Sequence, residues 1–261
     1  MTRTASSRAK PFAREASSSK LQASSRRGSA FGKILRALRG RYRATMLEGW
    51  AAERADPFHH LIGTILSARC RDEVTDVVSR KLFEAYPTPE KLAAAPPRHI
   101  ERLIRSIGFF RMKAKYVIET SRMLMEEYGG RVPETLEELT RFPGVGRKVA
   151  NCVLVYAFGK PAIAVDTHVH RVSNRLGWVK TKTPDQTERA LERILPRGHW
   201  LEINELLVAH GKAVCRPIRP LCEECGVARM CPKVGVQSQG WSRPLSHRRV
   251  RPETVSAPPS P

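Results

Sequence analysis

Residues 139–170 read LTRFPGVGRKVANCVLVYAFGKPAIAVDTHVH, and the expected fold is built around this stretch. A short helix is expected to end near Phe142, where the turn Pro143-Gly144-Val145-Gly146 follows it. A second helix is expected to start at Arg147, because apolar side chains recur at helical spacing beyond it, namely Val149, Cys152, Val153 and Tyr156. The pattern therefore predicts two helices joined by a tight turn.

The two glycines of this turn, Gly144 and Gly146, flank a single valine. Such a turn suits a hairpin whose backbone N–H groups point outward together. A group of amides at the N-terminus of a helix can bind a phosphate oxygen. An ordinary corner between two helices explains the same spacing, so the spacing alone leaves both interpretations open.

Lys148 and Asp166 are the candidate reactive residues. Lys148 lies in the first turn of the second helix, where the partial positive charge of the helix end disfavours an ammonium, and a neutral amine is a nucleophile. Asp166 precedes another helical run at 167–176, where an aspartate ordinarily caps the helix. If the chain doubles back after Gly159, the carboxylate comes near the amine, although the spacing does not require it.

Apolar stripes and capping residues predict about ten helices with short loops, so the expected fold class is all-α. A first helix is expected within 31–54, with its apolar face formed by Ile34, Leu35, Leu38, Tyr42 and Met46. A later helix is expected to bury Val74, Val77 and Val78. Gly108 and Gly211 are each expected to end a helix. The only strand-like stretch, Ala162–Asp166, is too short to count as a strand.

The chain is strongly basic, with a formal net charge of +21 over 261 residues. Without residues 1–30 and 233–261, which we expect to be disordered basic tails, 34 basic and 23 acidic residues remain, a net charge of +11. This charge favours a polyanionic partner, although solubility alone is the alternative explanation. No run of 18 uncharged apolar residues occurs, so no membrane-spanning helix is expected.

Four of the six cysteines lie within 17 residues, with the spacing Cys215-x6-Cys222-x2-Cys225-x5-Cys231. Such crowding in a basic chain without a membrane span indicates a metal site rather than disulfides. Four thiolates can hold either Zn²⁺ or a [4Fe–4S] cluster. Zinc sites usually pair their cysteines as two close knuckles, which the outer spacings of six and five do not provide.

The segment FPGVGRKVANCVLVYAFGKPAIAVDTHVHRVSNRLGW resembles the helix–hairpin–helix and Gly/Pro-Asp segment of the endonuclease III family of DNA glycosylases with apurinic/apyrimidinic (AP) lyase activity. The resemblance extends from about Asp56 to Cys231. It implies the two-lobed helix–hairpin–helix DNA glycosylase fold. It also implies that Lys148 is the Schiff-base nucleophile, that Asp166 is the second catalytic residue, and that the four cysteines hold a [4Fe–4S] cluster.

The resemblance also implies a domain division. Residues 56–160 form the six-helix domain with the helix–hairpin–helix. Residues 161–232 form the iron–sulfur cluster domain, which the first helix within 31–55 joins. Double-stranded DNA lies across the cleft between the two lobes, with Lys148 on one wall and Asp166 on the other.

Several DNA contacts follow from the same resemblance. They are the hairpin residues Pro143, Gly144, Val145, Gly146 and Arg147, together with His168, Arg216 and Arg219. Phe109 stands where the family carries its apolar wedge, unless it is a core residue beside a helix end. Arg69 replaces a glutamine that bacterial members insert near the orphaned base. Because arginine donates to guanine O6 and N7 but cannot accept, the opposite-base preference is open.

These residues predict a bifunctional DNA glycosylase/AP lyase of base excision repair. It removes oxidised pyrimidines and nicks the strand 3′ to the abasic site by β-elimination. The expected partner is DNA with damaged bases or abasic sites, bound by a monomer. The alternatives are a monofunctional mismatch or adenine glycosylase, whose members carry Ser or Tyr in place of Lys148, and a non-catalytic DNA-binding module.

The compartment is open. A bacterial or archaeal protein would act in the cytoplasm or nucleoid, and a eukaryotic one in the nucleus or mitochondrion. The Ser- and Arg-rich N-terminal stretch resembles a transit peptide in composition.

Overall fold

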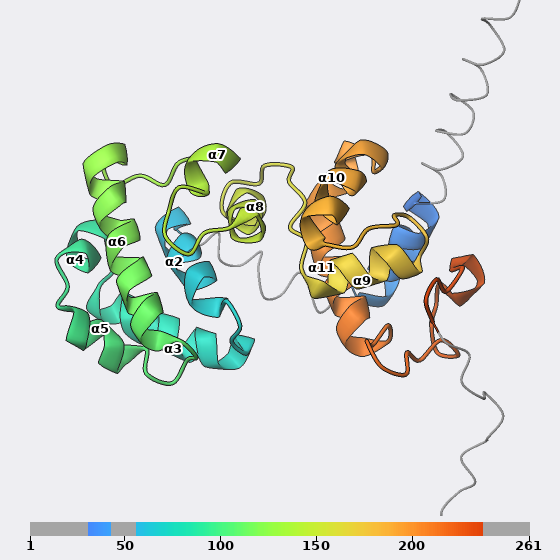
Figure 1. Ribbon diagram of the computed structural model, residues 1–261, viewed down its shortest axis with the longest axis horizontal. Helices are drawn as coiled ribbons and strands as arrows, with labels where there is room; N and C mark the ends of the chain where they lie inside the picture. The colour runs from blue at the N-terminus through green and yellow to red at the C-terminus, as the bar shows by residue number, and fades with distance from the viewer. Residues whose placement is uncertain (1–30, 43–55, 237–261) are drawn as a thin grey trace, which may run out of the picture.

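The computed structural model describes residues 31–42 and 56–236, and these ranges contain helices and loops without a β-strand (Figure 1). A helical stretch at 31–42 comes first. The α-helices that follow are α2 (Pro57–Ser67), α3 (Asp72–Ala85), α4 (Pro89–Ala93), α5 (Pro97–Leu103), α6 (Phe110–Tyr128), α7 (Leu136–Leu139), α8 (Arg147–Tyr156), α9 (Thr167–Arg175), α10 (Pro184–Ile194) and α11 (Trp200–Ala213). Two short 3-10 helices are η1 (Arg197–His199) and η2 (Ala228–Met230). The predicted all-α fold class is confirmed.

Capping residues explain where many of these helices begin. The Asp56 side chain accepts a hydrogen bond of 2.9 Å from the Phe58 amide, and Pro57 occupies the first helical position of α2. The side chains of Thr88, Thr135 and Thr183 cap α4, α7 and α10 in the same way. None of the helices in the described ranges is long and apolar enough to cross a membrane.

The buried hydrophobic side chains form two clusters. The first core contains residues from Phe58 to Ala162, contributed by α2 to α8. The second core contains residues from Ile163 to Val227 together with Phe31, Ile34, Leu35, Leu38 and Tyr42 of the N-terminal helical stretch. In Figure 1 the N-terminal stretch (blue) accordingly lies beside α9 and α11, far from its sequence neighbours α2 and α3.

Three expected details of the helices were wrong. Helix α5 ends at Leu103 rather than at Gly108. Ile104 and Ile107 are buried, but they belong to the turns that follow the helix. Val77 is 52% exposed, because the buried face of α3 is formed by Thr75, Val78 and Leu82.

Helix α11 continues through Gly211 to Ala213. Gly211 lies where α11 contacts α9, and a Cβ atom there would lie 2.7 Å from Nδ1 of His168. This glycine therefore provides a close helix contact instead of a helix end.

Some expectations lie outside the described residues. These are the tail at 1–30, the part of the first helix beyond residue 42, including Met46, and residues 237–261 of the C-terminal tail.

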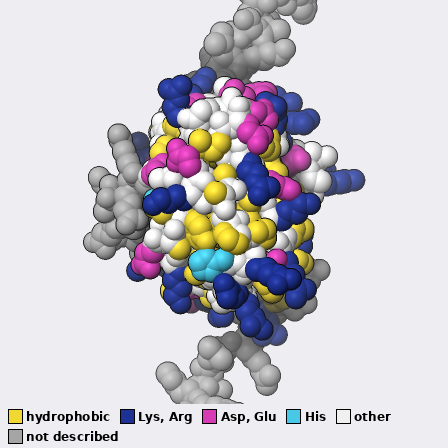
Figure 2. All heavy atoms as spheres, turned by 90° about the vertical axis from the view of Figure 1, so that its left-hand side faces the viewer, with side chains coloured by type: hydrophobic (Ala, Val, Ile, Leu, Met, Phe, Trp, Pro, Cys, Tyr) yellow, Lys and Arg dark blue, Asp and Glu magenta, His cyan; other side chains and the backbone are white. Residues whose placement is uncertain are grey.

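The end of the molecule formed by α4 and α5 has a mixed surface. Figure 2 shows basic and acidic side chains interspersed there around a central strip of hydrophobic side chains. A surface without one dominant sign of charge gives no reason to place a polyanion at this end.

Candidate active site

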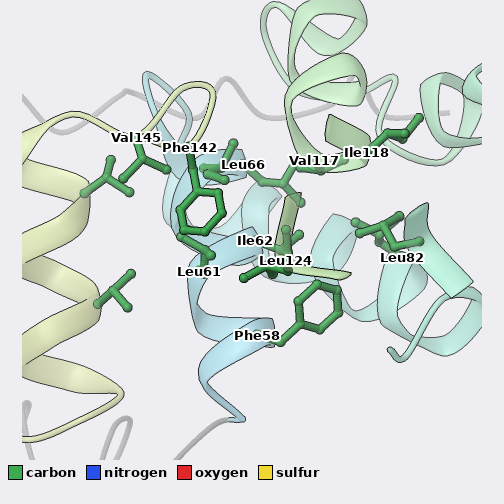
Figure 3. Close-up of a cluster of buried hydrophobic side chains, with 14 of the residues drawn as sticks. Phe58, Leu61, Ile62, Leu66, Leu82, Val117, Ile118, Leu124, Phe142 and Val145 are labelled. Carbon is green, nitrogen blue, oxygen red and sulfur yellow. The ribbon is translucent and has the colours of Figure 1, made fainter. Parts of the chain in front are cut away.

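The turn between α7 and α8 is fixed to the first core. Phe142 and Val145 are 2% and 5% exposed, and Figure 3 shows both side chains directed into the core around Leu61 and Leu66. Gly144 has φ +77°, and a Cβ atom there would lie 2.5 Å from Cδ2 of Tyr116. Only glycine fits this position without strain.

Gly146 is the N-cap of α8, with φ −91° and ψ 176°, and no side chain of the described residues caps this helix end. The amides in the first turn of a helix lack intrahelical acceptors. Those of α8 can therefore donate to an anion that approaches the hairpin. Pro143 is half-buried, while Gly144 and Gly146 are exposed.

Arg147, the first residue of α8, does not point freely into solvent. Its Nη2 and Nε atoms donate to the Glu188 carboxylate at 2.5 and 3.3 Å. Glu188 belongs to α10 and is 2% exposed, and its hydrogen bond raises the pKa of Arg147. The guanidinium thus links two helices, and the main-chain amide is the part of Arg147 that lies at the hairpin.

Lys148 is exposed in the first turn of α8, and Asp166 is half-buried at the start of α9. The Oδ1 atom of Asp166 accepts hydrogen bonds of 2.9 Å from the His168 amide and 2.8 Å from the Val169 amide. The expectation that Asp166 caps a helix is therefore confirmed. Its other carboxylate oxygen, Oδ2, has no hydrogen bond to a described residue.

The chain from α8 to Asp166 is held by two asparagines. Asn151 of α8 donates from Nδ2 to the Ile163 carbonyl at 3.1 Å, and Asn204 of α11 donates to the Ala164 carbonyl at 2.7 Å. Residues 162–165 are buried. Asn151 is the third residue after Lys148, and Ile163 is the third residue before Asp166. The hydrogen bond between them therefore limits how far Lys148 and Asp166 can separate.

The thiol of Cys152 is buried in α8. Burial raises the pKa of the Cys152 thiol, the Lys148 ammonium lowers it, and the Asp166 carboxylate raises it further. Both charges thus act on one buried thiol, which lies one helical turn beyond Lys148. By residue type, the exposed Lys148 amine can provide a nucleophile, and the half-buried Asp166 carboxylate can stabilise developing positive charge.

Arg69 and Phe109 lie side by side on the surface. The Arg69 guanidinium carbon lies 5.9 Å from the centre of the Phe109 ring. Phe109 is 58% exposed, so its interpretation as a core residue was wrong. Both residues have positive φ, 56° for Arg69 and 58° for Phe109, a conformation that costs non-glycine residues free energy.

The remaining predicted DNA contacts lie near α9 and the cysteines. His168 is half-buried; burial is the main cause that lowers its pKa, and its Nδ1 lies 3.1 Å from Nη2 of Arg171. Arg216 and Arg219 lie in an exposed loop whose carbonyls at Arg216 and Pro217 accept hydrogen bonds from Arg175.

The four clustered cysteines line one pocket of about 390 Å³, counting its opening to solvent. The rest of the lining is mainly apolar and includes Val172, Leu176 and Val227 of the second core, together with the buried Val214. No group of three or more His, Cys, Asp or Glu side chains in the described ranges is arranged to hold a single metal ion.

The side chains of His210 and Arg175 contact cysteine sulfurs, and the Lys233 amide donates to Cys231 Sγ at 3.3 Å. Nε2 of His210 lies 3.7 Å from Cys225 Sγ, and its Nδ1 lies 3.0 Å from the Tyr42 hydroxyl. Arg175 donates to Cys215 Sγ at 3.5 Å. Burial, with Arg41 nearby, lowers the pKa of His210 to about 4, so the ring is neutral at neutral pH.

Residues that hold the site in place were missed from the sequence, among them Asn151, Arg175 and Lys113. Asn151 carried a usable signal, because it is a polar residue within the otherwise apolar run 149–156. Arg175 and Lys113 carried none, since their partners lie about 40 residues or more away in sequence.

Comparisons with known proteins identify the family of this chain. Residues 62–197 match the family described as "HhH-GPD superfamily base excision DNA repair protein". Endonuclease III of Thermotoga maritima is 55% identical over 179 residues, which cover 69% of this chain and 84% of the relative. The chain belongs to the endonuclease III family.

Other members of the family are also similar. Endonuclease III of Bacillus subtilis is 42% identical over 178 residues, covering 68% of this chain and 81% of the relative. Among solved structures, a trapped endonuclease III–DNA covalent intermediate superposes with a TM-score of 0.68 at 37% identity. That match covers 77% of this chain and 95% of the endonuclease III chain. The helix–hairpin–helix glycosylase fold predicted from the hairpin sequence is therefore confirmed.

Proposed function

We propose that this chain is a bifunctional DNA glycosylase and AP lyase, which removes oxidised pyrimidines from double-stranded DNA and cuts the strand 3′ to the abasic site. The observation that carries the proposal is an exposed Lys148 in the first turn of α8 and an Asp166 carboxylate at the start of α9, on two segments that the hydrogen bond from Asn151 to the Ile163 carbonyl joins. The similarity to a trapped endonuclease III–DNA covalent intermediate supports it.

In this mechanism the nitrogen lone pair of the Lys148 side chain attacks C1′ of the damaged nucleotide. The bond from C1′ to the base breaks, and the base leaves with its bonding electrons and takes up a proton. Positive charge develops on the sugar as that bond breaks, and the Asp166 carboxylate stabilises it. The two amides that hold Asp166 Oδ1 fix the direction of the carboxylate.

The covalent intermediate then opens to an imine between Lys148 Nζ and C1′. Loss of a proton from C2′ expels the phosphate at C3′, which cuts the strand. Water hydrolyses the imine and returns the free amine. A monofunctional enzyme would release the base without the covalent bond to lysine.

DNA binding is assigned to the hairpin, to the loop of Arg216 and Arg219, and to Arg69 with Phe109. The exposed amides of the hairpin and the guanidinium groups of Arg216 and Arg219 bind backbone phosphates. Arg69 and Phe109 fill the space that the extruded nucleotide leaves. The two lobes, residues 56–160 and residues 161–232 with the first helix, lie on either side of the DNA.

Cys215, Cys222, Cys225 and Cys231 fit a [4Fe–4S] cluster. A cluster with four cysteine ligands binds one thiolate per iron, so the four sulfurs surround a volume instead of meeting at one ion. The pocket that the four cysteines share agrees with this. The cluster would hold the loop of Arg216 and Arg219 against the second core. Brown protein with broad visible absorption supports the cluster, and colourless protein containing zinc contradicts it.

The test is borohydride trapping on duplexes that contain one thymine glycol or one abasic site. The unaltered chain should form a covalent complex, Lys148→Ala should form none, and Asp166→Asn should form it slowly. Lys115→Ala is the matched control, since Lys115 is another exposed lysine and lies on α6. Base release without trapping would point to a monofunctional glycosylase, and neither base release nor trapping would point to a binding module.

A further inference from the structure

Lys113 has no role in the proposed mechanism, but it is buried, with only 4% of its surface exposed. Its Nζ atom donates hydrogen bonds of 2.7 Å to the carbonyl oxygens of Leu66 and Ala68. Burial lowers its pKa, and Cys70 opposes that change. A charged group this deep in the protein needs a structural or functional reason.

The two acceptors show what Lys113 stabilises. Leu66 and Ala68 lie at the C-terminal end of α2, where the last carbonyls of a helix lack intrahelical donors and carry partial negative charge. Lys113 supplies both the donors and the positive charge from a different helix. It therefore acts as the C-terminal cap of α2, although it belongs to the first turns of α6.

Lys113 lies between the two strained surface residues. Arg69 directly follows Ala68, whose carbonyl Lys113 binds, and the Lys113 amide donates to the Phe109 carbonyl at 3.0 Å. The described residues contain four non-glycine residues with positive φ, and two of them are Arg69 and Phe109. A strained backbone persists only where its surroundings fix it.

We propose that Lys113 is a positioning residue, which holds Arg69 and Phe109 as one preformed element that enters damaged DNA. The inference rests on the proposed function. Without Lys113 the α2 end and the α6 start can move apart, so the contact between the guanidinium and the ring is lost. Both residues must then become ordered during nucleotide extrusion, and the cost of ordering them reduces the net free energy of DNA binding.

The experiment uses the full chain and compares two DNA substrates. Trapping at an abasic site in a duplex requires extrusion of the sugar, whereas an abasic site in a single strand requires none. Single-turnover trapping rates are measured on both, and the duplex-to-single-strand ratio is the readout. A general loss of folded protein lowers both rates and leaves this ratio unchanged.

Lys113→Met should lower the ratio by about tenfold, because extrusion becomes the slow step. Lys113→Arg, which keeps a buried cation and several donors, should recover most of the ratio. Lys115→Met is the control: Lys115 lies on the same helix, is 71% exposed and pairs with Glu119. Its ratio should equal that of the unaltered chain. An unchanged ratio in Lys113→Met would overturn the proposal.

A second comparison remains decisive if Lys113→Met does not fold. Lys113→Gln has a shorter, uncharged side chain and should lower the ratio by about threefold. In a chain that already carries Arg69→Ala and Phe109→Ala, the further change Lys113→Gln should have little additional effect, because it acts through Arg69 and Phe109. Full additivity would contradict the proposal. If the unaltered chain is trapped on neither substrate, the proposed lyase activity itself fails, whatever the Lys113 variants do.

Discussion

The Arg147 guanidinium and the Glu188 carboxylate join the helix that carries Lys148 to a helix of the other core. Arg147 begins α8, and Glu188 lies in α10 beside Leu191 of the second core. The Glu188 side chain is 2% exposed and that of Arg147 is 33% exposed, so the pair is largely removed from water. The position of the reactive amine thus depends on a contact across the two cores.

We predict that Arg147→Met destabilises the protein by about 3 kcal/mol or more, because it leaves the buried Glu188 carboxylate without a cation. Replacing both residues, as Arg147→Met with Glu188→Leu, should restore part of this loss, since no buried charge then remains. Urea unfolding of the two variants measures the difference. Equal stabilities of the single and double variants would show that the carboxylate is not the source of the cost.

The hairpin offers a second prediction from two neighbouring glycines. Gly144→Ala should cost about 2 kcal/mol, because φ is +77° and the new methyl group would overlap Tyr116. Gly146→Ala is the matched control: its φ is −91° and no atom lies within 4 Å of the added Cβ. It should cost about 1 kcal/mol or less, as expected for alanine at an N-cap. Thermal unfolding of both variants measures which of them is less stable. The prediction is wrong if Gly146→Ala is less stable than Gly144→Ala.

A third prediction concerns pH. Burial lowers the pKa of His60 from 6.5 to about 4, so the unfolded chain binds a proton there more readily than the folded chain. The contribution of His60 to the free energy of unfolding is fully present above about pH 6.5 and is lost as the pH falls toward 4. Between pH 7 and pH 5 the loss should be about 2 kcal/mol.

His60→Gln removes the titrating ring and should make the pH dependence shallower, whatever its stability at pH 7. Urea unfolding of both proteins at pH 7 and pH 5 gives the four free energies required. The effect of every other titrating group cancels in the comparison if those groups are undisturbed. Parallel pH dependences would mean that the folded protein accommodates a charged His60.

Local features of the site could be predicted from the sequence. The hairpin, the start of α8 at Arg147 and the Asp166 cap each depend on residues within a few positions of one another, so their spacing determines them. The four cysteines were equally visible, because one short segment supplies all of them. The distance between Lys148 and Asp166 could not be predicted in this way, because it depends on how the chain folds back between them.

Contacts between distant segments could not be predicted. Nothing near Lys113 or Glu188 indicates their partners, which lie 47 and 41 residues away. Gly211 was misread as a helix end because a glycine that ends a helix and one that admits a neighbouring helix look alike in sequence. Only the closeness of His168 distinguishes the two.

The last prediction concerns the proposed cluster and the hydrogen bond from His210 to Cys225. Because the His210 ring is neutral, one nitrogen donates and the other accepts; the Tyr42 hydroxyl can donate to Nδ1 and leave Nε2–H for the sulfur. Hydrogen bonds to cluster sulfurs favour the reduced, more negative state. His210→Leu should therefore lower the reduction potential, and Tyr42→Phe should lower it less. Voltammetry of the DNA-free protein measures both shifts, and an unchanged potential in His210→Leu would mean that the imidazole does not donate to the sulfur.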